Sequence, residues 1–219
     1  MTNKITLCIF DLDGVIVDTA KFHFLAWRNL ARTFGYELTK EQNEKLKGVS
    51  RVQSLECLLE WAGVTKTDDE KAALAASKND EYVASVQQVD TIEALSGVID
   101  FIHELKAKNI KIAIGSASKN AKLILERMGI IDLFDAIVDG TMTTKGKPDP
   151  EVFLLAAELT ACKPKNAIVF EDASKGIDAA LAANMYAVGV GDKQQLGHAH
   201  LVIAGFDNAD FEELTRRIK

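Results

Sequence analysis

Residues 5–19, ITLCIFDLDGVIVDT, place a short apolar run directly before two acidic residues and a glycine. The run from Ile5 to Phe10 is too short for a typical helix and indicates a buried parallel strand. Asp11, Asp13 and Gly14 then indicate a tight loop. This stretch therefore predicts a central strand that ends in a pair of carboxylates.

The same pattern of apolar run and polar loop recurs along the rest of the chain. Further strands are predicted at 110–114, 136–138, 167–170, 186–190 and 201–203. Helical stretches alternate with these strands, at 98–108, 120–128, 150–159 and 175–183. Strands that alternate with helices of this length form βαβ units. The expected fold class is therefore α/β, with a doubly wound, Rossmann-like parallel sheet covered by helices on both faces.

One region, from residue 18 to residue 90, breaks the alternation and contains no convincing strand. Its helical stretches are predicted at 20–34, 42–46, 54–61 and 68–86. The first of these carries Phe24, Trp27, Leu30 and Phe34 on one face, as an amphipathic helix does. We therefore expect an inserted all-helical cap domain at 18–90 and an α/β core formed by 1–17 and 91–219.

Composition excludes several classes of protein. Of 219 residues, 47% are hydrophobic and 26% are charged, which is typical of a globular protein. The net charge of −6 argues against a nucleic-acid or anionic-membrane partner. Cys8, Cys57 and Cys162 form no C-x-x-C motif, so neither disulfides nor zinc are expected. No apolar stretch approaches the length of a membrane span or signal peptide, so a cytoplasmic protein is expected.

Chemistry-bearing residues gather at the ends of the predicted strands, where open α/β sheets bind their ligands. In chain order they are Asp11 and Asp13, the segment 115–120 (GSASKN), Lys147-Pro148 and Glu171-Asp172. Clustered carboxylates repel one another unless a cation lies among them, and oxygen ligands without His or Cys favour Mg²⁺ over Zn²⁺. A lysine, hydroxyls and backbone N–H groups suit a phosphate. Together these residues predict a phosphoryl-transfer site.

Each of these motifs also has an ordinary structural explanation. Asp11-x-Asp13 and Glu171-Asp172 can cap helices, the Ser-Ala-Ser turn can be an N-cap, and Lys147 can be a solvated surface charge. The functional interpretation is favoured because all four occur in this order, each at a predicted strand end. A metal site at His198-x-His200 is not favoured, because no acidic residue accompanies the pair and a solvent-facing loop is expected there.

The motif series resembles the haloacid dehalogenase superfamily over essentially the whole chain. The resemblance rests on residues 11–19 (DLDGVIVDT), then Ser116, then Lys147-Pro148, then Glu171-Asp172. The second aspartate, Asp13, is similar to that of the phosphotransferase branch. The resemblance implies a cap of the small helical type after the first motif.

Segments of the expected cap resemble the beta-phosphoglucomutase family more specifically. These segments are Thr19-Ala20, His23-Phe24 and Ala26-Trp27, then residues 46–51 (LKGVSR) with Ser54-Leu55, then Lys78-Asn79-Asp80 with Tyr82, and in the core residues 116–120 (SASKN). The resemblance implies a Mg²⁺-dependent isomerase that converts β-glucose 1-phosphate into glucose 6-phosphate. It also implies β-glucose 1,6-bisphosphate as an activating intermediate.

The resemblance implies a role for each residue of the catalytic centre. Asp11 would be the nucleophile that forms an aspartyl-phosphate, and Asp13 a general acid and base with a raised pKa. Thr19 and His23 would contact Asp13 from the hinge and the first cap helix. Lys147, Ser116 and the Ala117 N–H group would bind the transferring phosphoryl group. The implied Mg²⁺ ligands are Asp11, Asp13 (through its backbone carbonyl), Asp172 and, directly or through water, Glu171.

The implied substrate site lies mostly in the cap. Arg51 would bind a second phosphate, because its planar fork suits bidentate contacts. Ser118, Lys119 and Asn120 would reach the same phosphate from the core. The sugar would be bordered by Trp27, Lys47, Gly48, Val49, Ser50, Ser54 and Lys78. Spacing alone favours solvated helix-surface charges for Lys47 and Arg51 and an ordinary surface or core residue for His23. The resemblance to the family reverses both interpretations.

Two other functions remain as alternatives. One is a sugar-phosphate phosphatase of the same fold, in which water rather than a sugar hydroxyl reaches the aspartyl-phosphate. The other is a non-catalytic sugar-phosphate sensor, against which the intact set of Asp11, Asp13, Lys147 and Asp172 argues. The expected partners are small sugar phosphates, and the expected oligomeric state is a monomer.

Overall fold

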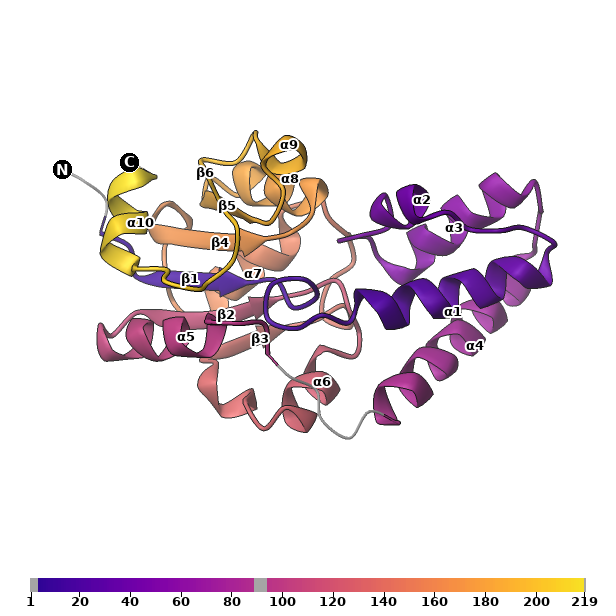
Figure 1. Ribbon diagram of the computed structural model, residues 1–219, viewed down its shortest axis with the longest axis horizontal. Helices are drawn as coiled ribbons and strands as arrows, with labels where there is room; N and C mark the ends of the chain where they lie inside the picture. Colours follow the sequence, from indigo (N-terminus) through magenta and orange to yellow (C-terminus); the bar gives the residue numbers. More distant parts are fainter. Residues whose placement is uncertain (1–3, 89–93, 219) are drawn as a thin grey trace.

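The computed structural model describes residues 4–88 and 94–218, and its α/β part lies beside a group of four helices (Figure 1). The strands are β1 (Leu7–Phe10), β2 (Lys111–Gly115), β3 (Ala136–Val138), β4 (Ala167–Glu171), β5 (Tyr186–Val190) and β6 (Leu201–Ile203). They form one sheet in the order β3-β2-β1-β4-β5-β6, and every pairing is parallel. The predicted α/β fold with a doubly wound sheet and a helical cap is confirmed.

Strand β1 shows why the sheet is covered on both faces. Its four residues are buried, and alternate side chains point to opposite faces. Cys8 and Phe10 belong to one hydrophobic cluster, whereas Leu7 and Ile9 belong to another. Each face therefore has its own apolar core, and β1 lies at the centre of both.

Core helices divide between the two faces. The first cluster includes residues of α5 (Val98–Ala107), α6 (Ala121–Arg127) and α10 (Phe211–Arg217). The second includes residues of α7 (Glu151–Leu159), α8 (Ser174–Ala182) and α9 (Lys193–Leu196). Short 3₁₀ turns at Ile131–Leu133 and Pro164–Asn166 precede β3 and β4. Helices α9 and α10 were not predicted from the sequence.

The cap consists of α1 (Ala20–Thr33), α2 (Lys40–Glu44), α3 (Arg51–Ala62) and α4 (Asp68–Gln87). It has its own apolar core, to which Trp27, Leu30, Leu55 and Leu58 contribute. The predicted 18–90 boundaries remain a prediction, since the second boundary lies outside the described residues. In the described part of the chain, no helix is long and apolar enough to cross a bilayer.

Helix α3 begins three residues earlier than the sequence pattern indicates. The Ser50 hydroxyl accepts a hydrogen bond from the Gln53 N–H group at 3.3 Å and so caps the helix. Arg51 is consequently the first residue of α3, and Lys47 lies beyond the end of α2. Gly48, with φ +67°, separates the two cations. The alternative that Lys47 and Arg51 are neighbouring charges on one helix is therefore wrong.

Candidate active site

The loop after β1 is shaped by a close approach between its glycine and Asp172. Gly14 has φ +84°, and a Cβ atom added there would lie 2.2 Å from Asp172 Oδ2. Only glycine fits both this backbone conformation and this space. The Asp11 N–H group continues the sheet by donating to the Phe170 carbonyl at 2.9 Å. The DLDG sequence thus brings Asp11 and Asp13 next to the carboxylates that follow β4.

Lys147 lies between two carboxylates at the centre of the core site. Its Nζ atom donates to Asp11 Oδ1 at 2.6 Å and to Glu171 Oε1, and its side chain is 1% exposed. Burial lowers the pKa of a lysine, but here the Asp11 and Glu171 carboxylates outweigh it and raise the pKa. The other Glu171 oxygen accepts from the Ala173 N–H group at 2.9 Å. Lys147 is therefore a permanently charged, fixed cation.

The carboxylates of Asp11, Glu171 and Asp172 fit a divalent cation. Each offers an oxygen atom, and these atoms lie within 4.8 Å of one another. Burial, followed by the Asp11 carboxylate, raises the pKa of Asp172 to about 7. This cluster holds more negative charge than Lys147 and Lys47 neutralise, and its donor set of oxygen atoms suits Mg²⁺.

Asp13 points its side chain away from that cluster and toward the cap. Thr19, which is fully buried, donates its hydroxyl hydrogen bond to Asp13 Oδ1, and His23 Nε2 lies 3.9 Å from the same oxygen. Burial and the Asp11 carboxylate raise the pKa of Asp13 to about 7. A carboxyl group with this pKa can both donate and accept a proton near neutral pH. Because the Asp13 side chain faces Thr19 and His23, only its backbone carbonyl is left as the predicted metal ligand.

Beyond Asp13, side chains from α1 and α4 form a second polar group, in which Lys78 makes no ion pair with a carboxylate of the described residues. Lys78 Nζ lies 2.9 Å from His23 Nδ1 and 4.6 Å from the centroid of the Trp27 ring. Burial and the charges of Lys78 and Arg51 hold the pKa of His23 well below its ordinary value. Burial and Arg51 lower the pKa of Lys78 to about 7. Neutral His23 therefore accepts a hydrogen bond from Lys78.

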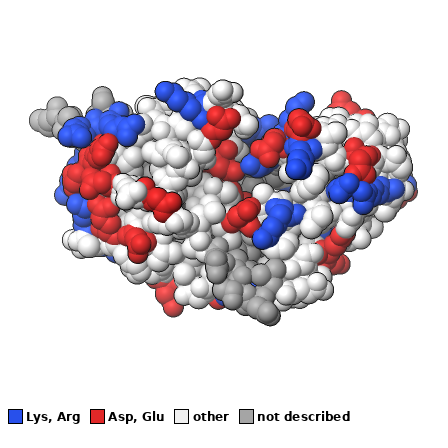
Figure 2. All heavy atoms as spheres, viewed as in Figure 1, with Lys and Arg blue, Asp and Glu red and all other residues white. Residues whose placement is uncertain are grey.

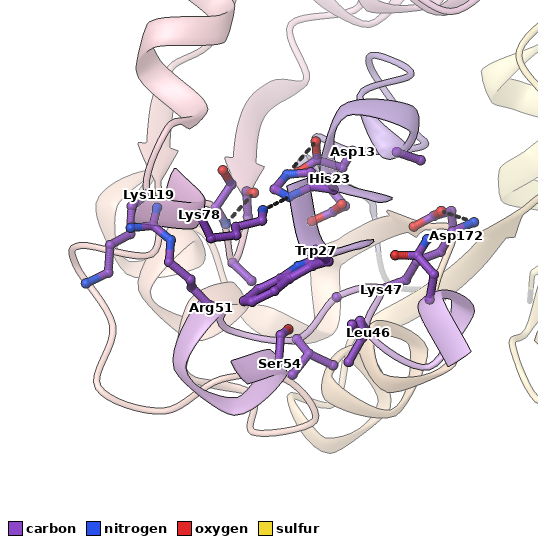
Figure 3. A pocket seen from close by; sticks show the side chains of 18 residues that line it. Asp13, His23, Trp27, Leu46, Lys47, Arg51, Ser54, Lys78, Lys119 and Asp172 are labelled. Carbon is purple, nitrogen blue, oxygen red and sulfur yellow. Dashed lines mark hydrogen bonds and ion pairs between the residues drawn. The ribbon is translucent and has the colours of Figure 1, made fainter. Parts of the chain in front are cut away.

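A cavity lies between the cap and the core, and most of the residues predicted for the site line it (Figure 3). These are Asp11, Asp13, His23, Trp27, Lys47, Gly48, Val49, Arg51, Ser54, Lys78, Ser116, Ala117, Ser118, Lys119 and Asp172. Four other predicted residues hydrogen-bond to this lining: Thr19, Ser50, Asn120 and Lys147. Glu171 lies behind it and accepts a hydrogen bond from Lys147. Sequence reasoning gave no role to Ala20, Asn43 and Leu46, which also line the cavity. Asn43 lies in α2, and Leu46 lies in the turn that follows it, where its N–H group donates to the Asn43 carbonyl at 3.0 Å.

Polar contacts connect the cap to the core on two sides of the cavity. On one side, Lys47 Nζ lies 3.5 Å from Asp172 Oδ2. On the other, Arg51 Nη2 donates to Asn79 Oδ1 at 2.6 Å, and Asn120 Nδ2 donates to the same oxygen at 2.9 Å. In Figure 3, Arg51 and Lys119 lie on the side of Trp27 opposite to Lys47 and Asp172. The cavity thus has a carboxylate centre and, apart from it, a cationic end.

The outer surface has no comparable separation of charge on the face shown in Figure 2. Acidic and basic side chains are interspersed there, and both signs flank the hollow where the two parts of the molecule meet. His198 and His200 are exposed, as expected; His198 lies 3.3 Å from Asp178, and His200 accepts from the Ala187 N–H group. All three cysteines are free thiols.

Comparisons with known proteins agree with this geometry. Residues 8–190 match the family model described as haloacid dehalogenase-like hydrolase. A beta-phosphoglucomutase of Bacillus subtilis is 46% identical over 197 residues, covering 89% of this chain and 87% of that protein. A phosphorylated carbohydrates phosphatase of Thermotoga maritima is 32% identical and covers 81% of each chain.

Among solved structures, a beta-phosphoglucomutase from Clostridium difficile superposes with a TM-score of 0.93 and 41% sequence identity. The match covers 98% of this chain and 97% of the other. The family model spans both the core and the cap, and the relatives match over most of their own length. This chain therefore belongs to the haloacid dehalogenase-like hydrolase family and is an enzyme similar to the beta-phosphoglucomutases.

Proposed function

We propose that this enzyme is a Mg²⁺-dependent beta-phosphoglucomutase, which converts β-glucose 1-phosphate into glucose 6-phosphate through β-glucose 1,6-bisphosphate. The observation that carries the proposal is the division of the cavity into a carboxylate centre around Asp11 and a separate cationic end around Arg51. A phosphatase needs one phosphate site. A mutase must hold two phosphates at once, and this cavity offers a place for each.

Asp11 is the nucleophile in this proposal. Lys147 holds one oxygen of its carboxylate at 2.6 Å and thereby orients the group. A bond forms between an Asp11 oxygen and phosphorus as the bond between phosphorus and the sugar oxygen breaks. Ser116, whose side chain is buried at the end of β2, and the Ala117 N–H group hold the equatorial oxygens of the transferring group.

Asp13 moves the proton in both halves of the reaction. Its proton goes to the leaving sugar oxygen when the aspartyl-phosphate forms, and it takes a proton from the attacking hydroxyl when the phosphoryl group returns. Its pKa of about 7 suits both tasks. Thr19 holds one oxygen of the Asp13 carboxyl group, so the group keeps one orientation.

The Asp11 and Asp172 carboxylates and the Asp13 backbone carbonyl would hold Mg²⁺, with Glu171 bound directly or through water. The ion would supply positive charge to the transferring phosphoryl group. Lys147 adds a second, fixed charge. Without these positive charges, the three neighbouring carboxylates of Asp11, Glu171 and Asp172 would repel a phosphate.

The cap supplies the sugar site and excludes water. Lys47, Trp27 and Lys78 reach into the cavity, and Gly48, Val49, Ser50 and Ser54 complete its border with the sugar. Arg51, together with Ser118, Lys119 and Asn120, binds the phosphate that is not being transferred. We propose that the enzyme works as a monomer, because one chain supplies both the carboxylate centre and the cationic end of the cavity. We also propose that it works in the cytoplasm.

The test is a steady-state assay of the purified enzyme with Mg²⁺, β-glucose 1-phosphate and a trace of β-glucose 1,6-bisphosphate. Glucose 6-phosphate is followed with a coupled dehydrogenase, and inorganic phosphate is followed colorimetrically in parallel. We expect glucose 6-phosphate to form in amounts equal to the substrate consumed. Release of inorganic phosphate alone would establish the phosphatase alternative instead.

A further inference from the structure

One oxygen atom, Oδ1 of Asn79, joins the cap to the core. It accepts hydrogen bonds from Arg51 Nη2 at 2.6 Å and from Asn120 Nδ2 at 2.9 Å. Arg51 begins α3, Asn79 lies on α4, and Asn120 immediately precedes the core helix α6. Arg51 and Asn120, which are 28 and 41 positions away from Asn79 in the sequence, therefore meet on a single acceptor atom.

The chemistry of arginine fixes the orientation of this contact. A guanidinium group has only donors, so the Asn79 atom that faces Arg51 must be the amide oxygen. Asn120 must then present its NH₂ group to that oxygen, because an oxygen would repel it. The amide orientations of Asn79 and Asn120 thus follow from the presence of Arg51, and neither can be reversed without breaking a contact.

Arg51 keeps its charge unneutralised in this arrangement. Among the described residues, no carboxylate lies within ion-pair distance of its guanidinium. Burial lowers its pKa, as expected for a half-buried cation without a paired anion. The Asn79 amide can orient the guanidinium without cancelling its charge, whereas a carboxylate at that position would cancel it and repel an incoming phosphate.

We propose that Asn79 is a positioning residue for the phosphate that is not being transferred. Its amide oxygen holds Arg51 of the cap and Asn120 of the core in one arrangement, so that both can bind the same dianion. This inference rests on the proposed function and extends it to a residue to which no role had been given. The two halves of the anion site are aligned only when the cap lies against the core, which ties substrate affinity to cap position.

Two substitutions of Asn79 distinguish a positioning role from simple packing: alanine removes the side-chain acceptor, and aspartate keeps the shape of the side chain but adds a negative charge. Asn79→Ala removes the acceptor, and we expect KM for β-glucose 1-phosphate to rise about tenfold while kcat changes less than about threefold. Asn79→Asp keeps both hydrogen bonds but places a negative charge beside Arg51. We therefore expect its KM to rise more, by about 100-fold, although it is the more conservative change.

A matched control is Asn29→Ala. Asn29 donates a hydrogen bond to Glu81 and so links α1 to α4, but it is exposed and does not line the cavity. Its KM and kcat should equal those of the wild type. If loosening of the cap helices were the cause of the Asn79 effect, Asn29→Ala would reproduce it. Should Asn79→Ala fail to fold, as judged by circular dichroism, the KM of Asn79→Asp alone tests whether Asn79 positions Arg51.

Binding without turnover provides a second readout. In EDTA the uncompensated carboxylates near Asp11 repel phosphate, so binding of β-glucose 1-phosphate reports mainly on the Arg51 end. Titration calorimetry should give a Kd that increases in the order wild type, Asn79→Ala, Asn79→Asp. Equal KM and Kd for wild type and Asn79→Asp would overturn the proposal. If the wild type fails to isomerise its substrate but this order of Kd holds, the proposed function fails and the role of Asn79 stands.

Discussion

Two buried lysines, one in the core and one in the cap, occupy opposite electrostatic environments. Lys147 contacts the carboxylates of Asp11 and Glu171, and its pKa is raised. Lys78 is 3% exposed, but it contacts the neutral His23 ring and the face of Trp27, and its pKa is lowered to about 7. Carboxylates of the protein neutralise the charge of Lys147, whereas no ion pair with a described residue neutralises that of Lys78.

This difference assigns a separate task to each part of the molecule. The core holds a compact group of acids and one paired lysine, which suits a metal ion and covalent phosphoryl chemistry. The cap offers Lys78 and Arg51 without carboxylate partners among the described residues, which suits an anionic substrate. In the proposed function, the charge of a phosphorylated sugar would balance the cations of the cap, and the charge of Mg²⁺ would balance the carboxylates of the core.

The largest expected effect is a loss of turnover caused by a substitution in the carboxylate centre of the core. Asp11→Asn removes the proposed nucleophile and should lower kcat by at least about 10⁴-fold, as removal of a covalent nucleophile does in other enzymes. The cap is untouched, so calorimetric binding of β-glucose 1-phosphate in EDTA should remain within about threefold of the wild type. An Asp11→Asn enzyme that still labels with phosphate or turns over would contradict the assignment.

Asp13→Asn tests the group that lies between the two parts. Loss of the proposed general acid and base should lower kcat by about 10²- to 10⁴-fold. The amide can still accept the Thr19 hydrogen bond, so the fold should be preserved. The measurement is the rate of glucose 6-phosphate formation, with the thermal midpoint as the control. Near-normal turnover would exclude Asp13 from proton transfer.

Replacing each lysine by methionine should sharpen the comparison. Lys147→Met leaves the buried carboxylates of Asp11 and Glu171 without their cation, so the free energy of unfolding should fall by about 3–5 kcal/mol. Lys78→Met removes an uncompensated charge and should leave that free energy unchanged within about 1 kcal/mol, while KM rises. Urea unfolding in EDTA measures both. Equal destabilisation by the two substitutions would mean that the two environments do not differ.

The smallest expected effect is a pH-dependent shift in thermal stability on Mg²⁺ addition. Burial and the Asp11 carboxylate raise the pKa of Asp172 from 3.8 to about 7 in the folded protein. The stability that this group contributes is therefore fully present below about pH 4 and is lost as pH rises through 7. Because a bound cation replaces the proton, Mg²⁺ should raise Tm more at pH 8 than at pH 6. A shift of the same size at both values would exclude a role for Asp172. Asp172→Asn should reduce the difference and leave the part due to Glu171, whose pKa burial raises to about 8.

The sequence was most informative where chemistry and strand ends coincide. Asp11, Asp13 and Glu171 follow or end short apolar runs, and Lys147 lies in the loop between β3 and α7; a parallel sheet brings such positions to one edge. The apolar runs predicted all six strands, including β3 and β6, whose residues are mostly half-buried. The start of α3 was predicted too late, since Ser50 is a cap whose bond to Gln53 has no periodic signal.

Contacts across the cavity could not be predicted in the same way. Asn79 and Asn120 lie on different parts of the molecule, and no local spacing relates them. The contact between Lys47 and Asp172 likewise depends on how the cap rests on the core. Helices α9 and α10 are short, with four and seven residues, and carry too few apolar residues for a clear helical period.

In the proposed mechanism the cap delivers a sugar hydroxyl rather than water to the phosphorylated Asp11, and one measurement tests this directly. Phosphorus NMR follows the fate of β-glucose 1-phosphate with Mg²⁺ and a trace of the bisphosphate, in parallel for the wild type and Arg51→Ala. For the wild type we predict growth of the glucose 6-phosphate signal without inorganic phosphate, and for Arg51→Ala a shift of the products toward inorganic phosphate. Inorganic phosphate as the main product of the wild type, or an unchanged product ratio in Arg51→Ala, would contradict the account.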